Sequence, residues 1–258
     1  MIRTQISFDA NTFPASLGQY VNNAKIYDSS CSKSAHTLYL EGDVKAFLKM
    51  AAAGKLLREK LMTDFMHSQG LAAKVLDYFS DESGDYLMTE ALGGEDGIAE
   101  HHLADPQRLA ACFGEYLQMI HRLPVHDCPF PGRTAEMIAE SEANIRRKYV
   151  DKSILLEDIS RAEQDFNHLK HCGKDDVVIH GDYCLPNIIM QNFRLSGFVD
   201  LGTGGVGDRH YDLFWGIWTL QYNLKTDKYR TIFLDAYGRQ QIDPLRLRLC
   251  HLLAGFTE

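Results

Sequence analysis

Long apolar runs are missing from this sequence of 258 residues. No stretch approaches the roughly 18 consecutive apolar residues that a membrane-spanning helix requires, so we expect no membrane association. The first residues, MIRTQISFDANTF, also lack the apolar core of a secretory signal peptide. We therefore expect a cytoplasmic protein.

Closely spaced cysteines are absent as well. The six cysteines form no C-x-x-C pair and are scattered along the chain: Cys31, Cys112, Cys128, Cys172, Cys184 and Cys250. Disulfide frameworks and zinc sites need closely spaced or regularly patterned cysteines, so these thiols are expected to be reduced and to serve packing. A chain of this length buries enough apolar surface to fold without such crosslinks.

Positive charge is in the minority, because 27 lysines and arginines stand against 35 acidic residues and give a formal net charge of −8. A nucleic-acid-binding protein needs a basic face, so nucleic acid is not an expected partner. An acidic balance favours solubility and is compatible with a cationic substrate.

Strand-forming residues dominate the first ninety or so positions, and helical periodicity dominates most of the remainder. Gly93 and Gly94 mark the change, with a hinge near 91–94. The sequence predicts an α+β protein with an antiparallel-sheet lobe over 1–92 and a mainly helical lobe over 93–258. Strands are expected at 19–28, 36–40, 44–50, 75–79 and 86–90, and helices at 52–68, from 106 onward, and at 134–148, 157–170, 208–222, 227–238 and 243–253.

One β-rich island, Val177–Leu201, interrupts the helices. The segment VVIHGDYCLPNIIM predicts a buried strand, a polar loop and a second strand, and the hairpin that follows ends at Asp200. Asp182, Asn187 and Asp200 are thus placed on loops at the ends of short strands, which hold side chains still and expose them.

These residue types suit phosphoryl transfer. The reaction needs a carboxylate that positions the attacking hydroxyl and accepts its proton, together with hard oxygen ligands for Mg²⁺. Asp182 fits the first role, and Asn187 and Asp200 fit the second. Asp182 and Asn187 are five residues apart, as are the Asp and Asn of a kinase catalytic loop.

On these motifs the chain resembles the aminoglycoside 3′-phosphotransferase family, which shares the protein-kinase-like fold. HGDYCLPN is similar to the family's HGDxxxxN motif, SGFVDLG to its second metal motif, and DRHYDL to the segment that follows. LYL…FLKM near Lys49, REK at 58–60, LMTEALGG at 87–94 and CPF at 128–130 also match in order. The similarity runs from about Ala24 to Phe256.

The resemblance implies a bilobal kinase-like fold and a role for each matching residue. Asp182 would be the catalytic base, Asn187 and Asp200 would bind Mg²⁺, and Asp212 would brace the catalytic loop. ATP or GTP would bind the first lobe. Its contacts there would come from Lys49, which would reach the phosphates and pair with Glu59, from Asn23, and from the backbone of Met88, Thr89 and Ala91.

The acceptor implied by the resemblance is a small cationic amino-sugar, in first place the 3′-hydroxyl of an aminoglycoside. Another small hydroxylated metabolite is the alternative acceptor. The family's C-terminal acidic pair is replaced here by Ala254-Gly255, and restoring Asp and Glu at these positions is expected to tighten the binding of kanamycin-like substrates. The expected contacts to the cation are Asp151, Glu157, Asp158 and Glu258. We expect a monomer or a weak homodimer.

Three other interpretations stay open. Gly202–Gly207 matches the G-x-G-x-x-G of dinucleotide-binding proteins. His180, Asp182, His210 and Asp212 would be the ligands of a metal-dependent hydrolase. A pseudokinase without activity is the third. His180 itself is expected to be a buried structural residue, and the aromatic residues of 211–218 are expected to be helix core.

Overall fold

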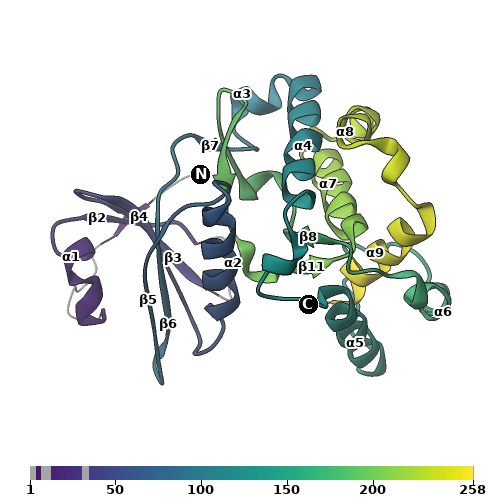
Figure 1. The fold of residues 1–258 in the computed structure, drawn as a ribbon, viewed down its shortest axis with the longest axis horizontal. Helices are drawn as coiled ribbons and strands as arrows, with labels where there is room; N and C mark the ends of the chain where they lie inside the picture. The colour runs from purple at the N-terminus through teal and green to yellow at the C-terminus, as the bar shows by residue number, and fades with distance from the viewer. Residues whose placement is uncertain (1–3, 7–12, 31–34, 258) are drawn as a thin grey trace. The chain divides into compact units, whose positions relative to one another are not determined.

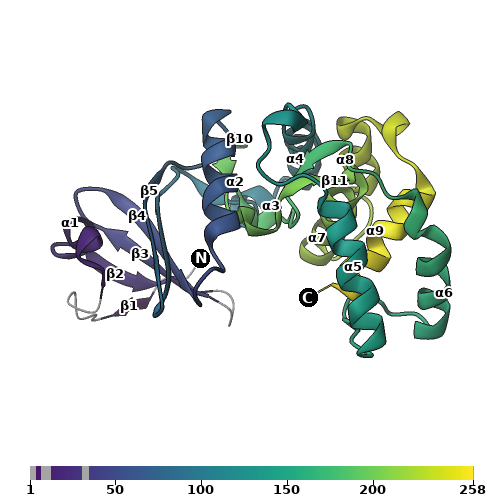
Figure 2. The same cartoon turned by 60° about the horizontal axis from the view of Figure 1, so that its bottom comes forward.

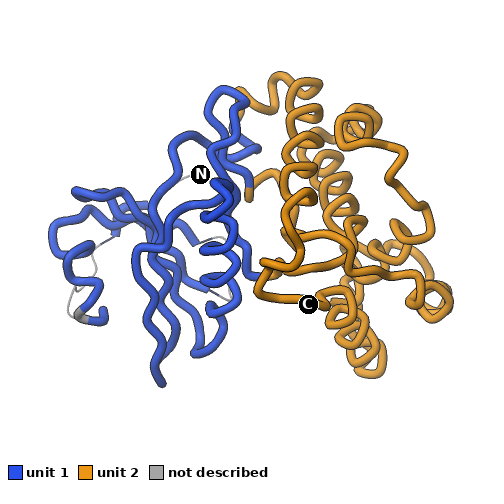
Figure 3. The backbone as a smooth tube through the Cα atoms, viewed as in Figure 1, with its two compact units in different colours: residues 1–99, 188–202 blue, residues 100–187, 203–258 orange. Residues whose placement is uncertain are grey.

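The computed structural model describes residues 4–6, 13–30 and 35–257, which form two compact units. Unit 1 contains residues 1–99 and 188–202, and unit 2 contains residues 100–187 and 203–258 (Figure 3). The expected lobes of 1–92 and 93–258 differ from these units, since residues 93–99 and 188–202 belong to unit 1. Pairing explains the difference, because β7 (Glu95–Asp96) is bonded to β9 (Ile188–Gln191), and β9 to β10 (Arg194–Phe198).

Unit 1 is built on a six-stranded antiparallel sheet of order β1-β2-β3-β4-β6-β5. Strands β1 to β5 of this sheet are labelled in Figure 2. The strands are β1 (Thr4–Ile6), β2 (Lys25–Asp28), β3 (His36–Glu41), β4 (Lys45–Ala51), β5 (Val75–Asp81) and β6 (Gly84–Glu90). Side chains alternate along β4, so Ala46 and Leu48 are buried in the core while Lys49 points to the opposite face. The sequence prediction of an antiparallel sheet is confirmed.

Helix α2 (Leu57–Ser68) lies beside this sheet (Figure 1). The loop before it is fixed by Asp85 of β6, a fully buried carboxylate that accepts hydrogen bonds from the backbone N–H groups of Gly54 at 2.9 Å and Leu56 at 2.7 Å. A side chain of the sheet therefore sets where α2 begins, and with it the position of Glu59 in the first turn.

The strand expected at 19–28 is only partly correct. Residues Gly18–Val21 form the short helix α1, after the 3-10 turn η2 (Ala15–Leu17), and the strand starts at Lys25. Leu17 and Val21 are both buried and four residues apart, so one helical turn places both on the core side. The alternation that looks like a strand in the sequence is satisfied equally well by this turn.

Unit 2 is mainly helical. Its helices are α3 (Glu100–Leu103), α4 (Pro106–His121), α5 (Arg133–Arg146), α6 (Ile159–Leu169), α7 (Arg209–Leu224), α8 (Arg230–Tyr237) and α9 (Pro244–Phe256). Four of them begin at an aspartate whose carboxylate accepts a backbone N–H, namely Asp105, Asp158, Asp208 and Asp243. The core gathers around α9, against which α5, α6 and α7 pack.

A two-stranded sheet completes unit 2. Strand β8 (Val177–Ile179) is fully buried and pairs antiparallel with β11 (Gly205–Gly207). Short 3-10 turns lie between the main elements: η3 (Val125–Asp127), η4 (Lys170–Cys172), η5 (Leu185–Asn187), η6 (Leu201–Thr203, in unit 1 up to Gly202) and η7 (Arg239–Gln241). No helix among the described residues is long and apolar enough to span a membrane.

Candidate active site

In unit 2 the motif HGDYCLPN leaves the end of buried strand β8 in a tight turn. Gly181 adopts a φ of 85°, a left-handed backbone that favours glycine. A side chain there would also overlap the carbonyl oxygen of Thr203. The turn therefore requires glycine, and it places Asp182 directly after a rigid strand.

Asp182 is held by Asn187 across the loop. The Asn187 Nδ2 group donates to the backbone oxygen of Asp182 at 2.9 Å and to its carboxylate Oδ2 at 2.8 Å. The turn η5 closes the loop, since the Asn187 N–H donates to the Cys184 carbonyl at 3.0 Å. The amide nitrogen of Asn187 is thus committed to Asp182, and its amide oxygen is the atom suited to a hard cation.

Asp212, in the first turn of α7, fixes the backbone of the same loop. Its fully buried carboxylate accepts the N–H of His180 at 2.7 Å and the N–H of Gly181 at 2.9 Å. Helix α7 holds the loop again at Thr219, whose Oγ1 accepts the Leu185 N–H at 3.2 Å. The expected brace by Asp212 is confirmed by these contacts.

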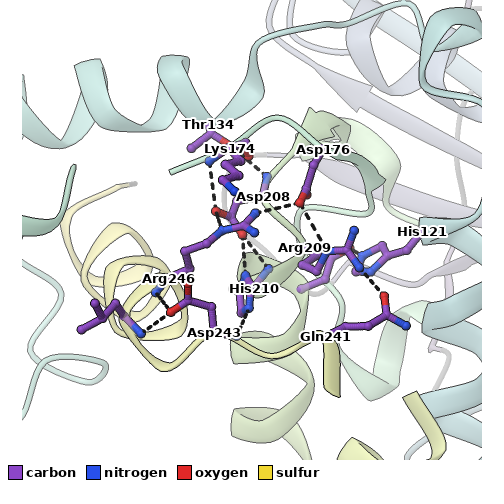
Figure 4. Close-up of polar contacts among 12 residues, drawn as sticks. His121, Thr134, Lys174, Asp176, Asp208, Arg209, His210, Gln241, Asp243 and Arg246 are labelled. Carbon is purple, nitrogen blue, oxygen red and sulfur yellow. Dashed lines mark hydrogen bonds and ion pairs between the residues drawn. The ribbon is translucent and has the colours of Figure 1, made fainter. Parts of the chain in front are cut away.

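A buried charge network anchors the start of α7 (Figure 4). The Asp208 carboxylate accepts from the N–H and Nδ1 of His210, at 3.0 and 2.7 Å, from Arg246 Nε at 2.8 Å and from the Lys174 N–H at 3.1 Å. Burial acts to raise the pKa of Asp208, but the hydrogen bonds from His210 and Arg246 outweigh it, and the pKa is lowered. Arg246 also reaches Asp176 at 3.0 Å, so α9 and the start of β8 are tied to α7.

Unit 1 contains a second charged group, formed by Lys49, Glu59 and Asp200. Lys49 Nζ lies 2.7 Å from Glu59 Oε2 and also contacts Asp200 Oδ1. Glu59 is buried, whereas the side chain of Asp200 is 52% exposed. The predicted pairing of Lys49 with Glu59 is confirmed.

The charges of Lys49, Glu59 and Asp200 shift the pKa values of Lys49 and Glu59. Burial alone would lower the pKa of Lys49, but attraction to Glu59 and Asp200 raises it, and the ammonium stays charged. Burial raises the pKa of Glu59, and the negative charge of Asp200 acts in the same direction against the attraction of Lys49. One ammonium is shared by two carboxylates, which leaves an excess of negative charge that suits a divalent cation.

Asp200 follows β10 with a φ of 62°, in the left-handed region that aspartate tolerates better than most residues. Its exposed carboxylate oxygens and the amide oxygen of Asn187 are the hard donors that Mg²⁺ prefers. By this chemistry the predicted ligands fit the metal, each within its own unit.

The other predicted nucleotide contacts all lie in unit 1. Asn23 is exposed in the turn before β2. Met88 and Thr89 lie in β6, a strand that is paired on both sides, with β4 and with β5. The Ala91 N–H donates to the Lys45 carbonyl at 2.8 Å, so binding of adenine through this N–H requires that bond to be exchanged.

The carboxylates predicted to hold a cationic acceptor are engaged within the chain. Glu157 pairs with Arg248 at 2.7 Å, and this hydrogen bond lowers the pKa of Glu157. Asp158 caps α6 by accepting the Arg161 N–H, and Asp151 accepts the N–H and hydroxyl of Ser153. Glu258 lies outside the described residues.

The packing of the C-terminal positions argues against the expectation that Asp and Glu at 254 and 255 tighten substrate binding. Ala254 and Gly255 are buried in the core, and a side chain at Gly255 would overlap Leu155, which is itself buried. The Gly255 carbonyl also accepts the Asp151 N–H at 2.9 Å. Acidic side chains placed here would disrupt packing before they met any substrate.

The structure removes two of the alternative interpretations. Gly202–Gly207 lies on η6 and on β11, an antiparallel strand, and so lacks the parallel unit that a dinucleotide fingerprint needs. No group of three or more His, Cys, Asp or Glu side chains suited to a metal ion occurs among the described residues. His210 and Asp212, offered as hydrolase ligands, instead bond to Asp208 and to the backbone of the loop.

The predictions that His180 is buried and that the aromatic residues of 211–218 are helix core are confirmed. His180 is fully buried, and Tyr211, Trp215 and Trp218 belong to or pack against the core around α9. The five described cysteines are free thiols, and Cys31 lies outside the described residues. Sequence reasoning missed the supporting groups Asp85, His121, Asp208 and Arg246, because no spacing signal links residues that meet only in the folded chain.

Comparison with known proteins decides the family. Residues 34–250 match the family model described as "APH: Phosphotransferase enzyme family". A probable aminoglycoside 3′-phosphotransferase of Lactococcus lactis is 38% identical over 249 residues, which are 95% of each chain. The chain belongs to the aminoglycoside phosphotransferase family. It is an enzyme that transfers phosphate to an alcohol. A second relative agrees: the chain is 31% identical to an aminoglycoside 3′-phosphotransferase of Niallia circulans, over 79% of this chain and 80% of the relative.

Solved structures confirm the kinase-like fold of this family member. The aminoglycoside-3′-phosphotransferase of type VIII superposes with a TM-score of 0.74 at 22% identity, covering 95% of both chains. The phosphotransferase APH(3″)-Id of Streptomyces rimosus, solved with ADP and streptomycin, gives a TM-score of 0.72 at 23% identity over 86% of this chain and 90% of the other.

Proposed function

We propose that this enzyme transfers the γ-phosphoryl group of ATP, or of GTP, to the 3′-hydroxyl of an aminoglycoside with the help of Mg²⁺. The observation that carries the proposal is the 38% identity to a probable aminoglycoside 3′-phosphotransferase over 95% of both chains. The geometry of the Asp182 loop supports the same chemistry. The reaction belongs in the cytoplasm, in a monomer or weak homodimer.

Asp182 orients the acceptor hydroxyl and accepts its proton as the oxygen attacks the γ-phosphorus. Its carboxylate is pre-oriented by Asn187 Nδ2 at 2.8 Å, and its backbone by the Asp212 contacts to His180 and Gly181. A carboxylate held in this way loses little further freedom when the acceptor binds, which is how positioning lowers a barrier.

Residues 1–92 bind the nucleotide and residues 93–258 bind the acceptor. Lys49, held by Glu59, contacts the phosphates, Asn23 adds an amide, and the backbone of Met88, Thr89 and Ala91 holds the base. Asn187 and Asp200 hold Mg²⁺, which when bound neutralises charge on the phosphates.

A second acceptor class, a small hydroxylated metabolite of lower charge, is favoured by one observation. Asp151, Glu157 and Asp158 already bond to groups of this chain, and the end of α9 offers Ala254 and Gly255 in the core. The three predicted carboxylates that the structure describes therefore already have partners within this chain, which favours an acceptor of lower charge.

ADP release with kanamycin B and with its 3′-deoxy analogue tests the proposal. The two substrates carry the same charges and differ at the predicted acceptor oxygen. Turnover of kanamycin B that depends on Mg²⁺ and is lost with the 3′-deoxy compound is the expected result. Equal turnover of both compounds excludes the 3′-hydroxyl, and turnover of a neutral polyol alone would establish the second acceptor class.

A further inference from the structure

His121, the last residue of α4, connects three helices to the loop that carries Asp182. Its Nε2 lies 3.2 Å from Asp212 Oδ2 on α7, and its Nδ1 lies 2.8 Å from the hydroxyl of Tyr237 on α8. The side chains of His121 and Asp212 are 3% and 0% exposed, so water does not replace these contacts. The two rings of His121 and Tyr237 meet edge to face, 5.4 Å apart.

The chemistry of the partners sets the direction of each hydrogen bond. Both oxygens of Asp212 already accept backbone N–H groups, so they act as acceptors and Nε2 of His121 is the donor to Asp212. Burial lowers the pKa of His121, and the opposing attraction of Asp212 does not reverse this, so the ring is neutral and Nδ1 accepts. Burial also raises the pKa of Tyr237 to about 12, which keeps the hydroxyl proton that Nδ1 needs.

The Asp212 carboxylate therefore receives three donors. Two are the N–H groups of His180 and Gly181, at 2.7 and 2.9 Å, and the third is His121 Nε2. The Oδ2 atom is shared by His180 N–H and by His121, so the imidazole fixes the rotation of the carboxylate about its Cβ–Cγ bond. Among the described residues, the other hydrogen bonds to this carboxylate come from the loop that Asp212 fixes, so His121 is the contact that holds it from outside the loop.

A side chain of α4 also holds Tyr237 in place. Gln118, one turn before His121, donates from Nε2 to the Ala236 carbonyl at 3.0 Å and also contacts the Tyr237 carbonyl. The end of α8 is thus fixed to the end of α4, which places the tyrosine hydroxyl against the imidazole. The ring of His121 is held from one side so that it can hold Asp212 on the other.

We propose that His121 is a positioning residue for phosphoryl transfer: with Tyr237 it orients Asp212, and through Asp212 it fixes the backbone of the loop that presents Asp182. It touches neither nucleotide nor acceptor in this role. The consequence for turnover rests on the proposed function, whereas the consequence for the loop does not.

Three substitutions separate positioning from simple packing. His121→Phe keeps a ring of similar size and removes both hydrogen bonds. His121→Gln keeps an N–H donor near the position of Nε2, which can still reach Asp212. Tyr237→Phe removes one hydroxyl from the far end. His126→Phe, at a histidine whose side chain is 79% exposed, is the matched control for the same chemical change.

Steady-state kinetics with kanamycin B should show a drop in kcat of roughly ten- to hundredfold for His121→Phe, because a small displacement of a reacting group is costly. The KM for the nucleotide should stay close to that of the wild type. His121→Gln should recover most of the lost kcat, Tyr237→Phe should lie between them, and His126→Phe should match the wild type. Equal losses in His121→Phe and His121→Gln would overturn the proposal.

Amide hydrogen exchange supplies a second readout that needs no activity. The backbone amides of His180 and Gly181 should exchange faster in His121→Phe than in the wild type. If His121→Phe does not fold, Tyr237→Phe is measured in its place, and the same faster exchange is expected. Wild-type protection of these amides in a folded variant would overturn the proposal. A wild-type protein that phosphorylates no aminoglycoside would refute the proposed function, and the exchange rates would still decide the role of His121.

Discussion

At the scale of single residues, Asp182 is positioned by groups that lie behind it in the fold. Glycine at 181 permits the turn, and Asn187 and Asp212 fix the side chain and the backbone around it. The motif predicts that Asp182 and Asn187 act together, because both lie within one loop, and the structure shows them in contact. The motif could not reveal His121, which is far away in sequence and meets Asp212 only after α4 and α7 have packed.

Replacing Asp182 by Asn should cut kcat by about 10²–10⁴-fold, the usual cost of losing a general base, while the Kd for the nucleotide changes little. The amide oxygen of Asn can still accept from Asn187, so the loop should keep its shape. Rapid-quench kinetics and calorimetric titration with nucleotide measure the two quantities. Asp227→Asn, an exposed carboxylate of the same unit, is the control. Near-normal turnover in Asp182→Asn would show that another group takes the proton.

Asp200→Ala should weaken binding of the Mg²⁺–nucleotide complex by roughly tenfold or more, and Asn187→Ala by less. A carboxylate brings a full charge to the cation and an amide only a dipole. Titration of nucleotide at several Mg²⁺ concentrations separates loss of metal from loss of nucleotide. Small and equal effects of the two substitutions would argue against metal binding by either residue.

At the scale of helices and strands, α7 links the charge network at its start to the loop that carries Asp182. Asp208→Asn would remove one of the two carboxylates that pair with Arg246, the other being Asp176, and breaking a buried pair of this kind costs up to about 3–5 kcal/mol. The free energy of unfolding, measured by urea titration, should fall accordingly. Asp235→Asn, which removes an exposed pair with Arg239, should change it little. Equal effects of the two would mean that the Asp208 network is not a stabilising one.

The same network predicts a dependence of stability on pH. The pKa of Asp208 is lowered in the folded protein, so its contribution is present above the ordinary value of 3.8 and is lost as the pH falls through the lowered pKa. The wild type should therefore lose stability in acid more steeply than Asp208→Asn. Parallel profiles for the two proteins would contradict this assignment.

Helix α9 packs against Leu155 at Gly255, a contact that the sequence does not predict. Leu155 occupies the space at Gly255 where a side chain would be, so Gly255→Ala should destabilise the protein by about 1–3 kcal/mol through overpacking. Leu155→Ala should cost about 2–5 kcal/mol through a cavity. In the double variant the alanine methyl partly fills that cavity, and the total should be well below the sum. Additive losses would show that the two residues do not pack on one another.

Element types were predictable where periodicity was long, as in α4 or α7, because many residues repeat the same signal. The short helix α1 was not, since four residues satisfy a strand pattern and a helical turn alike. The assignment of residues 188–202 to unit 1 has no signal in the sequence, because the pairing of β7 with β9 joins residues that are far apart along the chain.

At the scale of the whole molecule, family and fold followed from motifs distributed over most of the chain. The acceptor did not, because recognition of a cation depends on which carboxylates remain free after folding. Glu157, for example, counts as a negative charge in the sequence but is paired with Arg248 in the structure. Residue types alone therefore predict the chemistry better than the substrate.

The transfer of a labelled γ-phosphoryl group tests whether this enzyme phosphorylates the 3′-hydroxyl of an aminoglycoside. The protein would be incubated with Mg²⁺, kanamycin B and ATP labelled at the γ-position, and the product would be located by mass spectrometry and NMR. Label on the 3′-oxygen of the aminoglycoside, absent with Asp182→Asn, is the predicted result. Label found only in inorganic phosphate, or on a neutral polyol when this polyol and kanamycin B are offered together, would show that the enzyme is not an aminoglycoside 3′-phosphotransferase.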